Sequence, residues 1–343
     1  MLTLLLACSS SLDVAPGAGD FATDDKIYGG SAPDSAHHEA VVGLHQLTSS
    51  SVYVSPFCSG TLIAEDVVLT AAHCLDVAKG GKPKFQTMSP SQLAIYVGDD
   101  PSQDILQHLY VVSETLIHPN YSRNSLQNDI ALVRLSSAVS ESAPIANLPS
   151  SQAISNSDVG QDQNFAGFGQ TETGSSGVKL QVDVPLGGLG CSVAGCPSSG
   201  NSSTQVSYSQ TSGAGTCFGD SGGPMFTDRA GTWYVSGITS YGDSSCTVYG
   251  VSTKVDAYES WISDFVGTSD TGGGGGGGSD TADTADTGTS SGSCGDGVCG
   301  TGESCDGRDG TLTCSADCDG RTSGKKSNRY CYVEGSCEGP GCP

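Results

Sequence analysis

The stretch GDSGGP at residues 219–224 sets one serine, Ser221, in a turn of small residues. Two other stretches belong with it: LTAAHC at 69–74 contains His73, and NDIALVRL at 128–135 joins an acidic residue to an apolar run. A serine hydroxyl is a weak nucleophile at neutral pH, so it needs a base that accepts its proton and later returns it. Histidine can do both, because its ordinary pKa is about 6.5. The pattern predicts nucleophilic catalysis by Ser221 with His73 as general base.

The acidic residue of the third stretch is Asp129, and a buried carboxylate there would hold the histidine in the correct tautomer. Taken alone, Asp129 is a turn residue, and a histidine chosen at random is a surface or core residue. The order His73, Asp129, Ser221 within one chain favours the catalytic interpretation. We keep the ordinary interpretation for the other five histidines, which are His37, His38, His45, His108 and His118.

The three motifs resemble those of the chymotrypsin-like (trypsin-like) serine proteases, which carry histidine, aspartate and serine in the same order. The resemblance extends from Ile27 to Val266 and implies two six-stranded antiparallel β-barrels followed by a C-terminal helix. It also implies a serine endopeptidase that cleaves peptide bonds through an acyl-enzyme intermediate. The N–H groups of Gly219 and Ser221 would form the oxyanion hole, where one donor is worth about 10²- to 10³-fold in rate.

The residues themselves indicate an all-β domain between 27 and 266. Short runs rich in β-branched residues recur, separated by glycine, proline, serine and asparagine, which is typical of a β-sandwich or barrel. The clearest helix candidate is Asp256–Val266, where Asp256 suits the N-cap and the apolar residues fall at helical spacing. The expected strands are Val41–Leu47, Ser59–Ala64, Val67–Thr70, Leu93–Val97, Leu109–Leu116, Ile130–Leu135, Val178–Leu186 and Trp233–Ser240.

The resemblance also assigns the primary specificity pocket. Its floor is the residue six positions before the nucleophile, which is Gly215, and its walls contain Ser240, Gly242 and Gly250. Trypsin-like members have an aspartate at the floor, and a basic P1 side chain without that partner would be buried unpaired, which is costly. We therefore expect an open pocket that prefers apolar or aromatic P1 residues over lysine and arginine.

Residues 24–30, DDKIYGG, resemble the activation site of the same family. Cleavage after Lys26 would release the α-amino group of Ile27, which in the family pairs with the acidic residue before the nucleophile. That residue here is Asp220, and a buried charge is stable only when it is paired. We expect a zymogen activated by a protease of basic specificity. A linker lysine before a strand is the alternative.

Charge and cysteine content restrict the partners and the compartment. The 343 residues include 14 Lys plus Arg against 37 Asp plus Glu, a formal net charge of −23, which argues against nucleic acid and anionic membranes as partners. The 15 cysteines indicate an oxidising compartment. Residues 1–8, MLTLLLAC, predict a signal peptide that resembles a bacterial lipobox with Cys8 as the lipidation site; an ordinary secretory signal is the alternative. Residues 9–26 would be a propeptide leader. We expect an extracellular or bacterial cell-surface protein, anchored through Cys8 before activation.

The family resemblance suggests the cysteine pairing between residues 27 and 266. One pair brackets the catalytic histidine and another joins the pocket walls, whereas the usual partner of Cys191 is missing and Cys196 is the remaining candidate. The expected disulfides are Cys58–Cys74, Cys217–Cys246 and, less directly, Cys191–Cys196.

The C-terminal part changes in composition. Residues 267–293 contain seven consecutive glycines and predict a flexible Gly/Ser/Thr/Asp-rich linker. Residues 294–343 hold eight cysteines and predict a small disulfide-rich module. The stretch CGDGVCGTGESCDG at 294–307 resembles cysteine-rich CGDGxC segments in surface and secreted proteins of myxobacteria and their relatives. Several tail carboxylates offer oxygen ligands to a structural Ca²⁺, although solvated turn carboxylates are the alternative; they are Asp296, Glu303, Asp306, Asp309 and Asp317.

Two other functions compete with a protease. We expect a monomer that needs no cofactor or metal other than the candidate Ca²⁺ of the tail. Its expected partners are protein or peptide substrates, an activating protease of basic specificity and a cell-surface ligand of the tail. A binding or adhesion protein that uses the protease fold only as a scaffold is the main alternative, and the intact triad disfavours it. An esterase or lipase is disfavoured because GDSGG differs from the G-x-S-x-G turn between strand and helix.

Overall fold

The chain forms two compact units, Met1–Thr271 and Gly272–Pro343, and each is described by itself. Within the described residues, no helix combines the length and the apolar character needed to cross a membrane. The computed structural model describes five short strands between 303 and 338 and, in the first unit, residues 13–15, 27, 29–48, 51–79, 84–171, 174–197 and 200–267.

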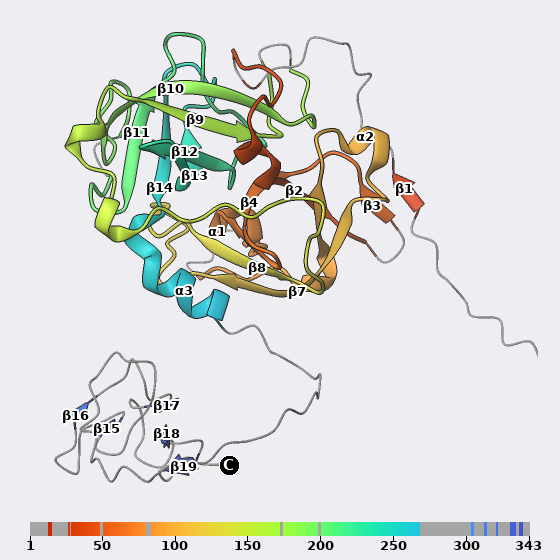
Figure 1. Ribbon diagram of the computed structural model, residues 1–343, viewed down its shortest axis with the longest axis vertical. Coiled ribbons are helices and arrows are strands. Elements are labelled where there is room, and N and C mark those ends of the chain that lie inside the picture. Colours follow the sequence, from red (N-terminus) through yellow and green to blue (C-terminus); the bar gives the residue numbers. More distant parts are fainter. Residues whose placement is uncertain are drawn as a thin grey trace, which may run out of the picture. The chain divides into compact units, whose positions relative to one another are not determined.

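Six antiparallel strands close into a first barrel in the order β2-β4-β5-β8-β7-β6, drawn in orange and yellow in Figure 1. Val42 of β2 pairs with Gly60 of β4 on one side and with Val97 of β6 on the other, which closes the sheet. The strands are β2 Val41–Gln46, β4 Cys58–Ala64, β5 Val67–Thr70, β6 Leu93–Val97, β7 Leu109–Ile117 and β8 Ala131–Leu135.

A second closed barrel follows in the order β10-β11-β14-β13-β12-β9, in green and teal in Figure 1. All of its pairings are antiparallel. The two barrels and the short helix after them confirm the predicted fold class. The strands are β9 Asp162–Gly167, β10 Leu180–Leu189, β11 Gln205–Ser209, β12 Pro224–Arg229, β13 Thr232–Gly242 and β14 Tyr249–Lys254.

The second barrel is less apolar than the first. In the first barrel β6 buries every residue of Leu93–Val97. In the second, β9 and β11 bury polar side chains, among them Gln163, Asn164 and Ser207. Gln163 Oε1 accepts a hydrogen bond from Thr227 Oγ1, so its burial is compensated. Because β9 and β11 mix such polar residues with apolar core residues, Phe165 in β9 and Tyr208 in β11, they are not among the strands that apolar runs predict.

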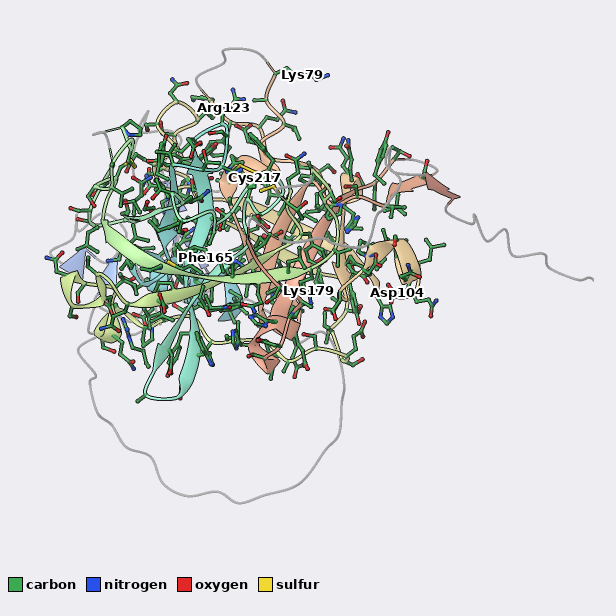
Figure 2. All side chains as sticks on the ribbon, turned by 90° about the horizontal axis from the view of Figure 1, so that it is seen from above. Lys79, Asp104, Arg123, Phe165, Lys179 and Cys217 are labelled. Atoms are coloured by element: carbon green, nitrogen blue, oxygen red, sulfur yellow. A yellow bond between two sulfur atoms is a disulfide. The ribbon has the colours of Figure 1, made fainter. Side chains whose placement is uncertain are left out.

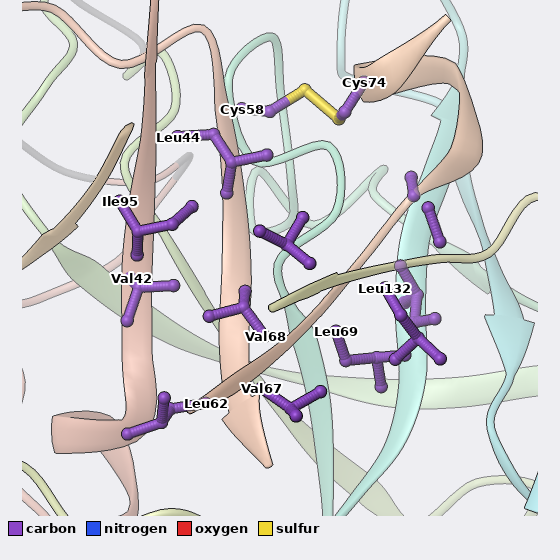
Figure 3. Packing of buried hydrophobic residues seen from close by; sticks show 14 of the residues in the cluster. Val42, Leu44, Cys58, Leu62, Val67, Val68, Leu69, Cys74, Ile95 and Leu132 are labelled. Carbon is purple, nitrogen blue, oxygen red and sulfur yellow. A yellow bond between two sulfur atoms is a disulfide. The ribbon is translucent and has the colours of Figure 1, made fainter. Parts of the chain in front are cut away.

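The buried apolar residues form two clusters, one centred on the first barrel and one within the second. The first core reaches the C-terminal helix through Ile262 and Phe265, and Figure 3 shows its aliphatic side chains packed below the Cys58–Cys74 disulfide. The second core contains Phe165, labelled in Figure 2, whose ring centroid lies 4.4 Å from that of Tyr208. The first core also includes Phe226 of β12 and Ile238 of β13, so apolar packing joins the two barrels.

The last helix begins differently from the prediction. Asp256–Tyr258 forms a 3-10 turn, η5, and the helix α3 covers Glu259–Gly267. The N-cap of η5 is Val255, which makes no side-chain cap bond. The carboxylate of Asp256 instead pairs with Lys254 Nζ at 3.2 Å and accepts the N–H of Ile154 at 3.4 Å. The prediction that Asp256 caps the helix was wrong, because these two partners take its carboxylate.

Shorter elements complete the two units. In the first unit they are β1 Asp13–Ala15, β3 Ser51–Tyr53, α1 Ala72–Leu75, α2 Pro101–Asp104, η1 Ala36–Ala40, η2 Pro90–Gln92, η3 Ser150–Gln152 and η4 Asn156–Asp158. In the second unit they are β15 Glu303–Ser304, β16 Leu312–Thr313, β17 Gly320–Arg321, β18 Tyr330–Val333 and β19 Ser336–Glu338. The predicted linker after Gly267 and the tail side chains lie outside the described residues.

Candidate active site

His73 and Asp129 come from two neighbouring strands of the first barrel. His73 lies in α1, directly after β5, and Asp129 lies directly before β8; these strands pair through Thr70 and Ala131. Asp129 Oδ2 accepts the Nδ1–H of His73 at 2.8 Å, and Asp129 Oδ1 accepts the backbone N–H of His73 at 2.9 Å. Since Nδ1 carries the proton, Nε2 can accept another one.

The carboxylate of Asp129 is fully buried, and three hydrogen bonds compensate its desolvation. The third donor is Ser240 Oγ, a residue that the sequence suggested only as a pocket wall. Burial alone would lower the pKa of His73, but the charge of Asp129, its hydrogen bond and the charge of Asp76 together raise this pKa above its ordinary value. The site therefore stabilises the imidazolium that forms when His73 takes up a proton.

Ser221 lies in the turn between β11 and β12, and the first barrel holds this turn in place. Ser59 N donates to Ser221 O at 2.8 Å, and Ser59 Oγ donates to Gly219 O at 2.9 Å. Gly222 has a φ of 82°, and a Cβ there would lie 2.1 Å from Thr70 Oγ1, so only glycine fits. Sequence reasoning missed Ser59, because its only signal is its place after a cysteine.

A cavity of about 430 Å³ brings His73 and Ser221 to the same surface. Ser221 Oγ makes no hydrogen bond to any residue that the structure describes. Catalytic hydrogen bonds often close only in the complex with substrate. The remaining lining residues are Thr216, Cys217, Phe218, Thr239, Ser240, Tyr241, Gly242, Asp243, Ser244 and Cys246.

The cavity contains two of the four residues predicted for the primary pocket. Ser240 and Gly242 line it, whereas Gly215 and Gly250 are not among its lining residues. Larger side chains fill the space beside these two glycines, because a Cβ added to either would lie 2.5 Å or less from a neighbouring side-chain atom. Side chains therefore crowd Gly215 and Gly250 on the side where a Cβ would stand, and their place in the primary pocket stays a prediction.

Asp243 stands at the mouth of this cavity, but its carboxylate serves the loop that follows it. It accepts hydrogen bonds from the backbone N–H groups of Ser245, Val248 and Tyr249 at 2.7 to 3.0 Å. Burial would raise the pKa of Asp243, and these hydrogen bonds together with the Ser245 hydroxyl lower it well below its ordinary value. Its role is to hold the loop 243–249 in shape.

Three disulfides join the six cysteines of the two barrels. The Cys217–Cys246 bond lies in the cavity wall, and Cys217 is labelled in Figure 2. The Cys191–Cys196 bond closes a loop in the second barrel between β10 and β11. The sequence separations are 16 for Cys58–Cys74, 5 for Cys191–Cys196 and 29 for Cys217–Cys246.

Asp220, next to the nucleophile, is a buried acid without a cationic partner among the described residues. Its two oxygens accept the N–H groups of Gly169 and Cys217, both at 2.8 Å. Burial raises the pKa of Asp220 to about 7, although both hydrogen bonds oppose the shift. The position therefore favours either a neutral carboxyl group or the arrival of a positive charge.

Ile27 lies close to the segment that binds Asp220. It is fully buried in the second core and forms an antiparallel bridge with Thr171, two residues after Gly169. Lys26 and Cys8 lie outside the described residues. Ile27 and Asp220 therefore both bind to the segment 169–171 that follows β9.

One described group, Cys58, His73 and Cys74, has potential metal-binding atoms within 4.8 Å of one another. Both sulfur atoms are bonded in a disulfide and cannot act as thiolate ligands. This geometry belongs to the candidate active site and does not fit a metal centre.

Two six-stranded barrels, with a histidine–aspartate pair and a serine at one cavity, define a protein with the chymotrypsin-like serine protease fold. The family model described as Trypsin matches residues 27–262, and the chain belongs to this family.

Relatives in animals carry the same domain. The chain is 34% identical to CLIP domain-containing serine protease B4 of Anopheles gambiae, over 60% of this chain and 61% of the relative. It is 33% identical to Vitamin K-dependent protein C of Rattus norvegicus, over 62% of this chain and 47% of the relative. It is 29% identical to Chymotrypsin-like elastase family member 1 of Macaca fascicularis, over 72% of this chain and 92% of the relative. The chain therefore spans about half to three fifths of the length of the first two relatives.

Proposed function

We propose that this protein is a serine endopeptidase in which Ser221 is the nucleophile, His73 the general base and Asp129 the residue that orients His73. The observation that carries the proposal is the pair of hydrogen bonds between His73 and a buried Asp129 at a cavity shared with Ser221. No cofactor is needed, because the three side chains supply the nucleophile and the proton transfers.

In the proposed reaction, Ser221 Oγ attacks the carbonyl carbon of the scissile bond while His73 Nε2 takes the hydroxyl proton. The imidazolium then protonates the leaving amine, and an acyl-enzyme ester on Ser221 remains. A water molecule repeats the sequence on the ester and releases the acid. Asp129 stays ionised and stabilises the imidazolium in both steps.

The oxyanion of both steps would bind to the N–H groups of Gly219 and Ser221. Neither N–H donates a hydrogen bond to any residue that the structure describes, so both are available for a substrate oxygen. Gly219 has a φ of 101°, a conformation that glycine adopts without strain.

The proposed P1 preference is for apolar or aromatic residues over lysine and arginine. Among the residues that line the cavity, the only carboxylate is Asp243, and backbone N–H groups already occupy its oxygens. A P1 ammonium would therefore lose its hydration without gaining an anionic partner.

We also propose that the enzyme is made as a zymogen. Cleavage after Lys26 would create an ammonium group on Ile27, and Asp220 is the buried acid that lacks such a partner. Pairing the two charges would hold the turn 217–221, which contains both proposed oxyanion donors. In this proposal the chain is secreted or surface-bound, with Cys8 as the lipidation site of the uncleaved form and residues 294–343 as a separate disulfide-rich module.

Labelling with a fluorophosphonate probe tests this function directly. The full chain, cut after Lys26 with immobilised trypsin, is expected to be labelled at Ser221 and to hydrolyse casein, whereas the uncut chain reacts far more slowly. The Ser221→Ala variant is the control for specific labelling. A cut protein that remains unlabelled would refute the protease and favour the binding scaffold.

A further inference from the structure

The side chain of Gln210 lies behind Gly215, the position that sets P1 charge preference in trypsin-like relatives. A Cβ added to Gly215 would lie 2.5 Å from Gln210 Cγ and Cδ and 2.7 Å from Oε1. Real Cβ atoms do not approach other heavy atoms this closely, so a side chain at 215 has no room while Gln210 is present. Gln210 itself is buried, with 1% of its surface exposed.

The amide of Gln210 ties together the two walls of the cavity. Its Nε2 donates to Thr216 O at 3.1 Å and to Cys246 O at 2.8 Å, and its Oε1 accepts the N–H of Thr216 at 3.2 Å. Thr216 and Cys246 both line the cavity. Gln210 does not itself line the cavity, but its neutral amide lies behind these two lining residues and donates to both of their carbonyl groups.

Tyr208 fills the space beside Gly250 in the same way. It lies opposite Gly250 in the β11–β14 pairing, and a Cβ added to Gly250 would lie 2.4 Å from Tyr208 Cε2 and Cζ. Its hydroxyl is 2.8 Å from Thr216 Oγ1, and the residue is fully buried. Burial raises the pKa of Tyr208 to about 12, so this hydroxyl stays neutral across the working pH range. Both glycines that would make an open pocket are thus blocked from behind.

We propose that Gln210, supported by Tyr208, is the residue that limits the depth of the primary pocket and excludes charged P1 side chains. In this protein the P1 charge preference is set by Gln210, which directly follows β11, and not by a side chain at position 215. This inference rests on the proposed protease function and deepens it, because it names the residue that chooses the substrate class.

A double-mutant cycle on P1 selectivity tests the inference. The variants are Gln210→Ala, Gly215→Asp and the combination, each cut after Lys26, with active sites counted by fluorophosphonate labelling. The readout is the ratio of kcat/KM for peptide substrates with P1 lysine and P1 leucine.

Gln210→Ala opens space and leaves the carbonyl groups of Thr216 and Cys246 without their amide donor, so we expect the lysine-to-leucine ratio to rise about tenfold. Gly215→Asp alone collides with Gln210 and is expected to lower kcat/KM for both substrates. The combination gives the carboxylate room, and we expect its ratio to exceed that of Gln210→Ala by a further tenfold or more.

Two further variants control for the loss of a buried amide and for failure of Gln210→Ala to fold. Gln163→Ala removes a similarly buried glutamine of β9 whose hydrogen-bond partners do not line the cavity, and it should leave the ratio unchanged. Gln210→Asn withdraws the amide by one methylene and should give an intermediate ratio if the alanine variant does not fold.

The inference is overturned if labelled Gln210→Ala and Gln210→Asn keep the parent ratio. It is also overturned if Gly215→Asp alone matches the combination on P1 lysine. Failure of the parent to label at Ser221 would instead reject the protease function, and this inference with it.

Discussion

Ionisation of one buried residue, Asp220, should lower the stability of the uncleaved protein as pH rises towards neutral, and replacing it with asparagine should remove that contribution. In the folded chain the pKa of Asp220 is raised by burial to about 7, compared with 3.8 for an ordinary aspartate. Between these values the folded chain keeps a proton that the unfolded chain has lost. The free energy of unfolding therefore falls as pH rises through this window, and the loss is complete above pH 7.

The magnitude follows from the size of the shift. A difference of about three pKa units, at 1.36 kcal/mol per unit, corresponds to about 4 kcal/mol of lost stability above neutral pH. Asp220→Asn removes this loss but places an NH₂ group against the N–H of Gly169 or Cys217, which costs about 1–3 kcal/mol. The variant should be more stable than its parent by about 1–3 kcal/mol at pH 8. It should be less stable than its parent at pH 4.

Urea unfolding of the uncleaved chain checks this prediction, in the Ser221→Ala background so that no proteolysis intervenes. Asp243→Asn is the matched control, because loop hydrogen bonds lower the pKa of Asp243 and keep it ionised over the same pH range. Its stability difference from the parent should not change sign. A constant difference between Asp220→Asn and its parent from pH 4 to pH 8 would refute the reasoning. After cleavage at Lys26, the parent should gain stability at pH 8 and the Asp220→Asn variant should not.

Three other predictions follow from the two barrels. Burial lowers the pKa of His45 to about 4, although a hydrogen bond to Tyr53 O opposes the shift. The free energy of unfolding therefore falls by about 3 kcal/mol as pH falls from 6.5 to about 4. His45→Leu should remove this pH-dependent loss in urea unfolding. Asp129→Asn should lower kcat by about 10⁴-fold in active-site-titrated peptide assays while leaving the fold intact by circular dichroism. Replacing the Cys191–Cys196 bridge by alanines should cost about 2 kcal/mol, and the Cys217–Cys246 bridge about 3.5 kcal/mol, because the second closes a longer loop; equal losses in thermal unfolding would contradict the loop-entropy argument.

Several parts of the candidate site are readable from local sequence. The segments around His73, Asp129 and Ser221 can be recognised because each requires a specific residue next to a strand end or inside a glycine turn. The apolar strands of the first barrel are also visible, since β6 buries every residue and β2 buries all but its last. These features depend on residues that are close together in the chain.

Other parts depend on contacts between distant segments. Ser59 supports the turn that holds Ser221, although 162 positions of sequence separate them, and no local pattern marks this serine. Ser240 donates to Asp129 across the barrel seam. The strand β9 buries the polar side chains of Gln163 and Asn164, and hydrogen bonds with other strands compensate their burial.

By itself, the sequence determined the family, the two-barrel fold and the three residues proposed for catalysis, because those depend on short motifs and on strand patterning. Only the tertiary structure decided what surrounds the two glycines assigned to the specificity pocket. Gly215 and Gly250 suggest an open pocket when read along the chain, but the side chains of Gln210 and Tyr208 occupy the space beside them. The volume at a point in a folded protein is set by every chain segment that meets there, and a linear sequence does not list those neighbours.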